Sequence, residues 1–263
     1  MCPQTVGVFK RVCQTLRMNF KRIGKKDEKW AAKACLKSSE ILAEERNDRE
    51  MGAEKYLEEL IRRYPVLASV KENICQAYQI LEKCYREGGK LLVAGNGGSC
   101  ADSEHIVGEL MKGFCKKRRV PEDFAEALLK ADAKRGGQLA EALEGGLPAI
   151  ALTGHPGLST AFLNDVDGVY IYAQQIYGYG KEGDVFLGIS TSGNAKNILY
   201  AAAVARAKGM KVIGLTGKDG GELSGAADVA VIVPDKETYR IQELHLPIYH
   251  TLCLMLEERF FPE

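Results

Sequence analysis

The chain contains the run Val185-Phe186-Leu187-Gly188-Ile189-Ser190-Thr191-Ser192-Gly193-Asn194, in which a short apolar segment passes directly into three hydroxyl side chains. Apolar side chains recur at helical spacing in residues 195–207, so the run predicts a buried strand, a loop and a helix. The N-terminus of a helix carries unpaired N–H groups and partial positive charge, which favour a phosphate group. Because the loop holds no Lys or Arg, we expect hydroxyls and backbone amides to bind that phosphate. Ordinary helix capping is the alternative interpretation.

Four further apolar segments, at 90–94, 149–152, 211–215 and 229–233, repeat the strand pattern, with helices expected at 101–111, 195–207 and 238–258. Strands that alternate with helices predict a parallel sheet covered on both faces. We therefore expect an α/β fold, a doubly wound five-stranded parallel sheet sandwiched by helices, with ligands at the carboxyl ends of the strands. A second glycine-rich turn follows the first strand at residues 95–99. It departs from the dinucleotide pattern, because Cys100 stands where a glycine is required.

Two segments depart from this alternation. Residues 1–50 carry 12 Lys or Arg against 7 Asp or Glu and are interpreted as a basic, helical N-terminal extension. Poor order, a membrane-surface or targeting helix, and translation from Met51 are the alternatives for it. Residues 51–263 are expected to form one domain. A charged, Ala-rich helical insert occupies about 116–147 and is expected to break at Gly136-Gly137.

Composition and charge exclude several classes of protein. The chain is 46% hydrophobic and 27% charged, as is typical of globular proteins. No apolar run approaches the roughly 18 residues that a membrane span needs. Beyond residue 50 the chain has 24 Lys or Arg against 28 Asp or Glu, which argues against broad nucleic-acid binding. Eight scattered cysteines without a C-x-x-C pair indicate a reducing, cytoplasmic setting.

Polar side chains on two of the expected helices suggest chemistry. His105 and Glu109 are four residues apart on one helix face, where they could ligate a metal, act as acid and base, or form a surface pair. Gln242 and His250 are eight residues apart, a rise of about 12 Å. They can share one metal ion only if the helix is irregular or two chains contribute. His245 is expected to be simply packed or exposed.

Together these motifs resemble the phosphoheptose isomerases, sugar-isomerase (SIS) domain proteins that act on sedoheptulose 7-phosphate. The resemblance implies the flavodoxin-like SIS fold and a role in carbohydrate metabolism. The implied reaction forms D-glycero-D-manno-heptose 7-phosphate through an enediol. A homotetramer with shared active sites is also implied. No nucleic-acid or membrane partner is expected, because of the composition and charge given above. The resemblance covers about residues 55–112 and 148–260 and rests on residues 94–99, Asp102, His105, Glu109, 188–194, 215–221 and 240–245.

The resemblance also assigns roles to individual residues. It implies that Glu109 is the catalytic base that moves a proton between C1 and C2, with His250 as its acid/base partner. It implies one Zn²⁺ ion per active site, held by His105, Glu109, Gln242 and His250. The implied substrate-binding residues are Asn96, Gly97, Gly98, Ser99, Glu109, Asn164, Asp165, Ser190, Thr191, Ser192 and Gln242.

Three departures from the family's pattern leave the exact sugar open. Ala195 replaces a serine of the phosphate loop, Lys112-Gly113 replaces an arginine, and Tyr239 replaces an aspartate. Two non-catalytic functions are the alternatives: binding of the replication initiator DnaA, as in some relatives of the isomerases, and sugar-phosphate sensing. Those DnaA-binding relatives tend to lack the final histidine, so the presence of His250 favours the enzyme.

Overall fold

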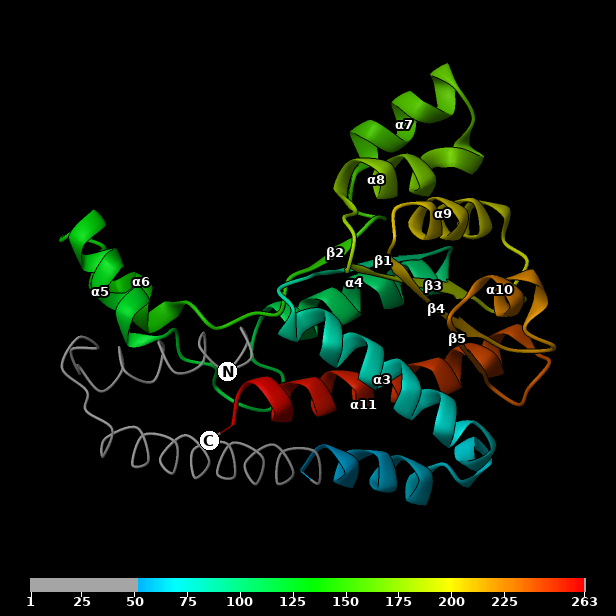
Figure 1. Cartoon of the computed structure of the whole chain (residues 1–263), viewed down its shortest axis with the longest axis horizontal. Coiled ribbons are helices and arrows are strands. Elements are labelled where there is room, and N and C mark those ends of the chain that lie inside the picture. The colour runs from blue at the N-terminus through cyan, green and yellow to red at the C-terminus, as the bar shows by residue number, and fades with distance from the viewer. Residues whose placement is uncertain (1–51, 263) are drawn as a thin grey trace, which may run out of the picture. The chain divides into compact units, whose positions relative to one another are not determined.

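A five-stranded parallel sheet with strand order β2-β1-β3-β4-β5 forms the centre of the computed structural model (Figure 1). The structure describes residues 52–262, so the expectations for residues 1–50 lie outside the described residues. All five expected strands are present, and the α/β prediction is confirmed. The strands are Leu91–Gly95 (β1), Ala149–Ala151 (β2), Val185–Ser190 (β3), Lys211–Thr216 (β4) and Val229–Ile232 (β5).

The connecting segments are mostly helical, and the three helices expected from apolar spacing are α4, α9 and α11. A helix over residues 52–63 opens the described part. The other elements outside the insert are Pro65–Val70 (η2), Lys71–Arg86 (α3), Gly98–Met111 (α4), Pro156–Asp165 (α7), Gly168–Tyr170 (η3), Ile171–Tyr179 (α8), Lys196–Ala207 (α9), Gly221–Ala226 (α10) and Thr238–Phe260 (α11).

Alternate side chains of the central strands enter two separate cores. Leu91 and Val93 of β1 pack with residues of α3, α4 and α11. Leu92 and Ala94, on the opposite face, pack with residues of α8 and α9. Figure 1 shows α3 and α11 on one side of the sheet and α8 and α9 on the other. Both faces are therefore covered, as the continuous apolar strands predict.

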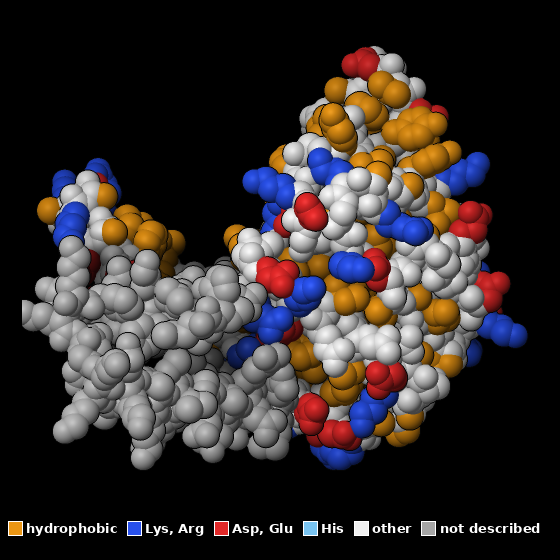
Figure 2. Space-filling view, viewed as in Figure 1, with side chains coloured by type: hydrophobic (Ala, Val, Ile, Leu, Met, Phe, Trp, Pro, Cys, Tyr) orange, Lys and Arg blue, Asp and Glu red, His pale blue; other side chains and the backbone are white. Residues whose placement is uncertain are grey.

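The insert is helical, but its break was predicted at the wrong position. Its helices are Glu122–Ala131 (α5) and Gly136–Ala142 (α6), so the break lies at residues 132–135. A Cβ at Gly136 would lie 2.6 Å from the backbone of Leu128, so this glycine lets α6 begin close against α5. The insert buries little apolar surface of its own. Large apolar side chains are exposed along it (Figure 2): Phe124, Leu129, Leu139 and Leu143.

The register of the sheet brings two loops together. Gly95, the last residue of β1, is paired with Ile189 near the end of β3. The turn after β1 and the hydroxyl loop after β3 therefore leave the same edge as neighbours. Within residues 52–262, the helices fall short of the length or hydropathy that a transmembrane segment requires.

Candidate active site

A cavity of about 380 Å³ lies between the two loops, and we refer to it as the cradle. The N-termini of α4 and α9 border it, so unpaired N–H groups and two helix dipoles favour an anion there. Ser190 is buried, and the neighbouring hydroxyls line the same space. The lining residues are Asn96, Gly97, Gly98, Ser99, Ile189, Ser190, Thr191, Ser192, Ala195, Thr238 and Gln242.

The hydroxyl loop is held in a single shape by its own hydrogen bonds. The Gly193 N–H donates to the Ser190 carbonyl at 2.9 Å, and the Gly193 carbonyl accepts from the Leu223 N–H of α10 at 2.9 Å. Gly193 has φ +66°, and a Cβ there would lie 1.8 Å from the Gly220 carbonyl oxygen. Only glycine fits at this position. The donors of the cradle are therefore fixed before a ligand binds.

A second cluster joins the later turns of α4 to α11. His105 Nε2 lies 3.3 Å from Glu109 Oε1 and 3.4 Å from His250 Nε2. The Glu109 side chain is 13% exposed, whereas that of His105 is 41% exposed. Lys112 Nζ donates to the other Glu109 oxygen at 3.0 Å. A carboxylate, two imidazoles and an ammonium group therefore meet at this surface.

Tyr249 orients the ring of His105. Its hydroxyl donates to Asp102 Oδ1 at 3.1 Å and lies 3.1 Å from His105 Nδ1. Both contacts are satisfied when His105 carries its proton on Nδ1 and donates it to the tyrosine oxygen. The Nε2 lone pair of His105 then faces Glu109 and His250. Burial raises the pKa of Asp102, and the Tyr249 hydroxyl and His105 oppose that rise.

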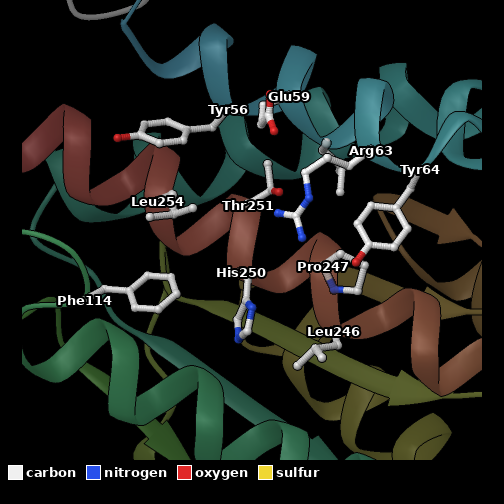
Figure 3. A pocket seen from close by; sticks show the side chains of 11 residues that line it. Tyr56, Glu59, Arg63, Tyr64, Phe114, Leu246, Pro247, His250, Thr251 and Leu254 are labelled. Carbon is white, nitrogen blue, oxygen red and sulfur yellow. The ribbon is translucent and has the colours of Figure 1, made fainter.

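An apolar pocket of about 310 Å³ adjoins His250 (Figure 3). Phe114, Leu246 and Pro247 line it, and Arg63 reaches toward His250 from the helix over residues 52–63. Burial lowers the pKa of His250, and the neighbouring His105 and Arg63 lower it further, against an opposing effect of Glu109. His250 is therefore mostly neutral near pH 7, when an imidazole can either accept or donate a proton.

The remaining expected site residues lie apart from this cluster. Gln242 lines the cradle, where its amide lies so close to Gly98 that a Cβ there would be 2.6 Å from Nε2. Asn164 and Asp165 end α7, where both are exposed and hydrogen-bonded to each other at 2.9 Å. The chain thus brings together three of the four expected zinc ligands and most of the expected substrate contacts.

Sequence reasoning missed several residues of the site. Asn197 exchanges two side-chain hydrogen bonds with Asn96, at 3.0 and 2.8 Å, and so joins the two loops. Thr238 lines the cradle at the start of α11. Tyr249 precedes His250 directly, but no spacing rule marked it. Arg63 carries no sequence signal, because only the folded chain brings its helix to α11.

Comparison with known proteins decides the family. The phosphoheptose isomerase of Helicobacter hepaticus is 40% identical over 184 residues, which span 70% of this chain and 81% of that protein. The phosphoheptose isomerase of Aneurinibacillus thermoaerophilus is 39% identical over 177 residues, or 67% and 76% of the two chains. This chain belongs to the phosphoheptose isomerase family. It is therefore an isomerase, as its resemblance to that family predicts. A family model described as the SIS domain matches residues 125–217.

Solved phosphoheptose isomerase structures share the fold. The phosphoheptose isomerase of Francisella tularensis superposes with a TM-score of 0.59 at 32% identity, covering 78% of this chain and 95% of that one. The phosphoheptose isomerase GmhA of Neisseria gonorrhoeae gives a TM-score of 0.56 at 30% identity, covering 82% and 96%. The predicted SIS fold is thereby confirmed.

Proposed function

We propose that the substrate of this isomerase is sedoheptulose 7-phosphate and that the product is D-glycero-D-manno-heptose 7-phosphate. The observation that carries the proposal is the pairing, in one chain, of a hydroxyl-lined cradle with a carboxylate that faces two imidazoles. The cradle suits the ester phosphate, and Glu109 suits removal of a proton next to a carbonyl. The names of the relatives described above indicate a phosphoheptose, and the family resemblance supplies sedoheptulose 7-phosphate.

The proposed reaction moves one proton between two carbons. The cradle binds the phosphate and so fixes the distance of C1 and C2 from the catalytic groups. Glu109 removes a proton from C1 of the ketose and returns it to C2 of the enediol. His250, mostly neutral near pH 7, shuttles the hydroxyl proton between O2 and O1 as the carbonyl moves. Lys112 Nζ donates to Glu109 at 3.0 Å and so places a positive charge beside the proposed base.

We also propose that Zn²⁺ binds at His105, Glu109 and His250. The donor separations of 3.3 and 3.4 Å match the edge of a tetrahedron with bonds of about 2.0–2.1 Å. Among residues 52–262 no three His, Cys, Asp or Glu side chains already stand in the geometry of a metal site, so binding requires these three side chains to adjust. Gln242 lies in the cradle, so the fourth contact is assigned to Gln242 of a second copy. When bound, Zn²⁺ would polarise the carbonyl and stabilise the enediolate oxygen.

The dimensions of α4 support the proposal of a homo-oligomer with shared active sites. Eleven residues separate Gly98 from Glu109, a rise of about 16 Å along the helix. An extended seven-carbon sugar phosphate spans about 10 Å if each single bond is about 1.5 Å. The cradle of one copy is therefore proposed to work with Glu109 and His250 of another. We propose a tetramer as this assembly, with Asn164 and Asp165 as further substrate contacts.

The alternatives fit the site less well. A DnaA-binding protein or a sugar-phosphate sensor requires the cradle, but neither requires a carboxylate aligned with two imidazoles. On the face shown in Figure 2, basic and acidic side chains are interspersed over the described residues, which does not favour a nucleic-acid partner. A cytoplasmic location and a role in carbohydrate metabolism belong to the same proposal.

The direct test is an assay with sedoheptulose 7-phosphate on the wild type, Glu109→Gln and His250→Gln. Loss of a general acid or base lowers kcat by about 10²–10⁴-fold. Both variants should still bind inorganic phosphate, because the cradle is unchanged. Failure of the wild type to convert the substrate, or equal slow conversion by all three proteins, rejects the proposal.

A further inference from the structure

Glu109 lies in the last turn of α4, the part of a helix that is held least firmly. The last four carbonyls of a helix lack partners within it, and terminal turns open at little cost. α4 has no basic residue in its last turn, and Lys112 after it is extended with φ −138°, so a glycine-type cap is absent here. Groups from outside α4 must therefore hold this turn.

Arg118 supplies two of those groups, and the Leu147 N–H, which donates to the Leu110 carbonyl at 2.9 Å, supplies another. Arg118 Nη1 donates to the Leu110 carbonyl at 2.8 Å, and its Nη2 donates to the Glu109 carbonyl at 3.1 Å. The guanidinium thus binds two of the carbonyls at the end of α4, one of them on Glu109 itself. Its positive charge also faces the negative end of the helix dipole. A planar guanidinium fixes both bonds at once, which an ammonium group cannot do as rigidly.

Glu257 of α11 completes the arrangement. Its carboxylate accepts from Arg118 Nε at 2.9 Å and from the Phe114 and Cys115 N–H groups at 2.8 and 2.9 Å. The Arg118 and Glu257 side chains are 0% and 2% exposed. Burial alone would raise the pKa of Glu257, but the two N–H groups and Arg118 outweigh it and lower the pKa. Two buried opposite charges therefore join the end of α4 to α11, the helix that carries His250.

We propose that Arg118 is a positioning residue for the isomerase reaction, which holds the backbone of Glu109 in register with His250 on α11. The inference rests on the proposed function, because it concerns the residue that removes the proton. It also gives a role to the two ends of the insert, where the insert joins the rest of the domain. The Gly145 N–H donates to the Arg118 carbonyl at 2.6 Å, and Glu144 accepts from the Gly113 N–H at 2.6 Å. The two ends of the insert are thus hydrogen-bonded to each other and to the segment that follows α4.

The test separates positioning from simple stability. Arg118→Met leaves Glu257 buried without its partner and should lower both kcat and the unfolding temperature. The double variant Arg118→Met/Glu257→Gln holds neither buried charge and should regain thermal stability. Arg259→Gln is the matched control. It removes a half-buried pair of α11, between Arg259 and Glu82 at 3.0 Å, that does not touch α4.

We expect Arg118→Met to lower kcat for sedoheptulose 7-phosphate by about 10–100-fold, as a misplaced catalytic group does, with KM little changed. The double variant should have the same low kcat as Arg118→Met although its unfolding temperature recovers. If Arg118→Met fails to fold, the kcat of the double variant tests the inference instead. Arg259→Gln should lose thermal stability and keep its kcat. Recovery of kcat together with stability, or an unchanged kcat in the Arg118 variants, would overturn the inference. An inactive wild type would instead reject the proposed function.

Discussion

Replacement of His245 by Gln should change how the stability of the protein depends on pH. His245 is fully buried on α11, and its Nε2 lies 3.1 Å from the Thr216 carbonyl at the end of β4. The carbonyl can only accept, so Nε2 carries the proton. Nδ1 is buried without a hydrogen-bond partner among the described residues. Gln can keep the donor to Thr216 while removing the titratable ring.

Burial lowers the pKa of His245 from 6.5 to about 4, and the contact with Thr216 only partly opposes it. Above pH 6.5 the ring is neutral in both the folded and unfolded states, so protonation of His245 does not change the free energy of unfolding. Between pH 6.5 and 4 the unfolded chain binds a proton that the folded chain does not bind. Stability is therefore lost as the pH falls, by about 1.4 kcal/mol per pH unit and about 3 kcal/mol in total.

Urea unfolding of the wild type and His245→Gln at one protein concentration, from pH 7.5 down to pH 4, measures this effect. Carboxylates titrate in both proteins, so the difference between the two free energies of unfolding isolates His245. We expect that difference to be small at pH 7.5 and to shift by about 3 kcal/mol in favour of the variant by pH 4. A difference that stays constant with pH would refute the reasoning.

Three further predictions concern the site. Gly193→Ala should lower the free energy of unfolding by about 1–3 kcal/mol and raise KM, because its Cβ meets the Gly220 carbonyl; urea unfolding and steady-state kinetics measure both. Ser190→Ala should raise KM and leave kcat nearly unchanged, since the hydroxyl binds the phosphate equally in the ground and transition states; a fall in kcat alone would contradict this. Chelation should lower kcat and added Zn²⁺ should restore it, with inorganic phosphate binding unaffected throughout; full activity of the metal-free protein would reject the zinc proposal.

The parts of the fold that follow from local patterns were predictable from the sequence. Each central strand is a short apolar run that is buried on both faces, and each ends at a glycine or hydroxyl residue that starts a loop. The cradle followed for the same reason, because carboxyl ends of parallel strands share an edge. The break in the insert was predicted at the wrong position because a glycine such as Gly136 is equally typical of a helix break and of a close contact between two helices.

Contacts between distant segments could not be predicted in this way. Arg118 and Glu257 are 139 residues apart, and nothing in either local pattern distinguishes them from surface charges. The role of Tyr249 could not be predicted, because a tyrosine next to apolar residues is usually a core residue. Only the family resemblance indicated Asn164 and Asp165 as site residues. Within one chain they lie at the end of α7 rather than in the cradle.

The central claim is that Glu109 removes the C1 proton of the bound ketose phosphate. Proton NMR of sedoheptulose 7-phosphate in D₂O measures that step directly, because an enediol exchanges C1 protons with solvent. We predict that the wild type replaces one of the two C1 protons with deuterium as the sugars equilibrate. Glu109→Gln should slow that exchange by at least about a hundredfold while it still binds inorganic phosphate. Exchange at the wild-type rate in Glu109→Gln would contradict the claim.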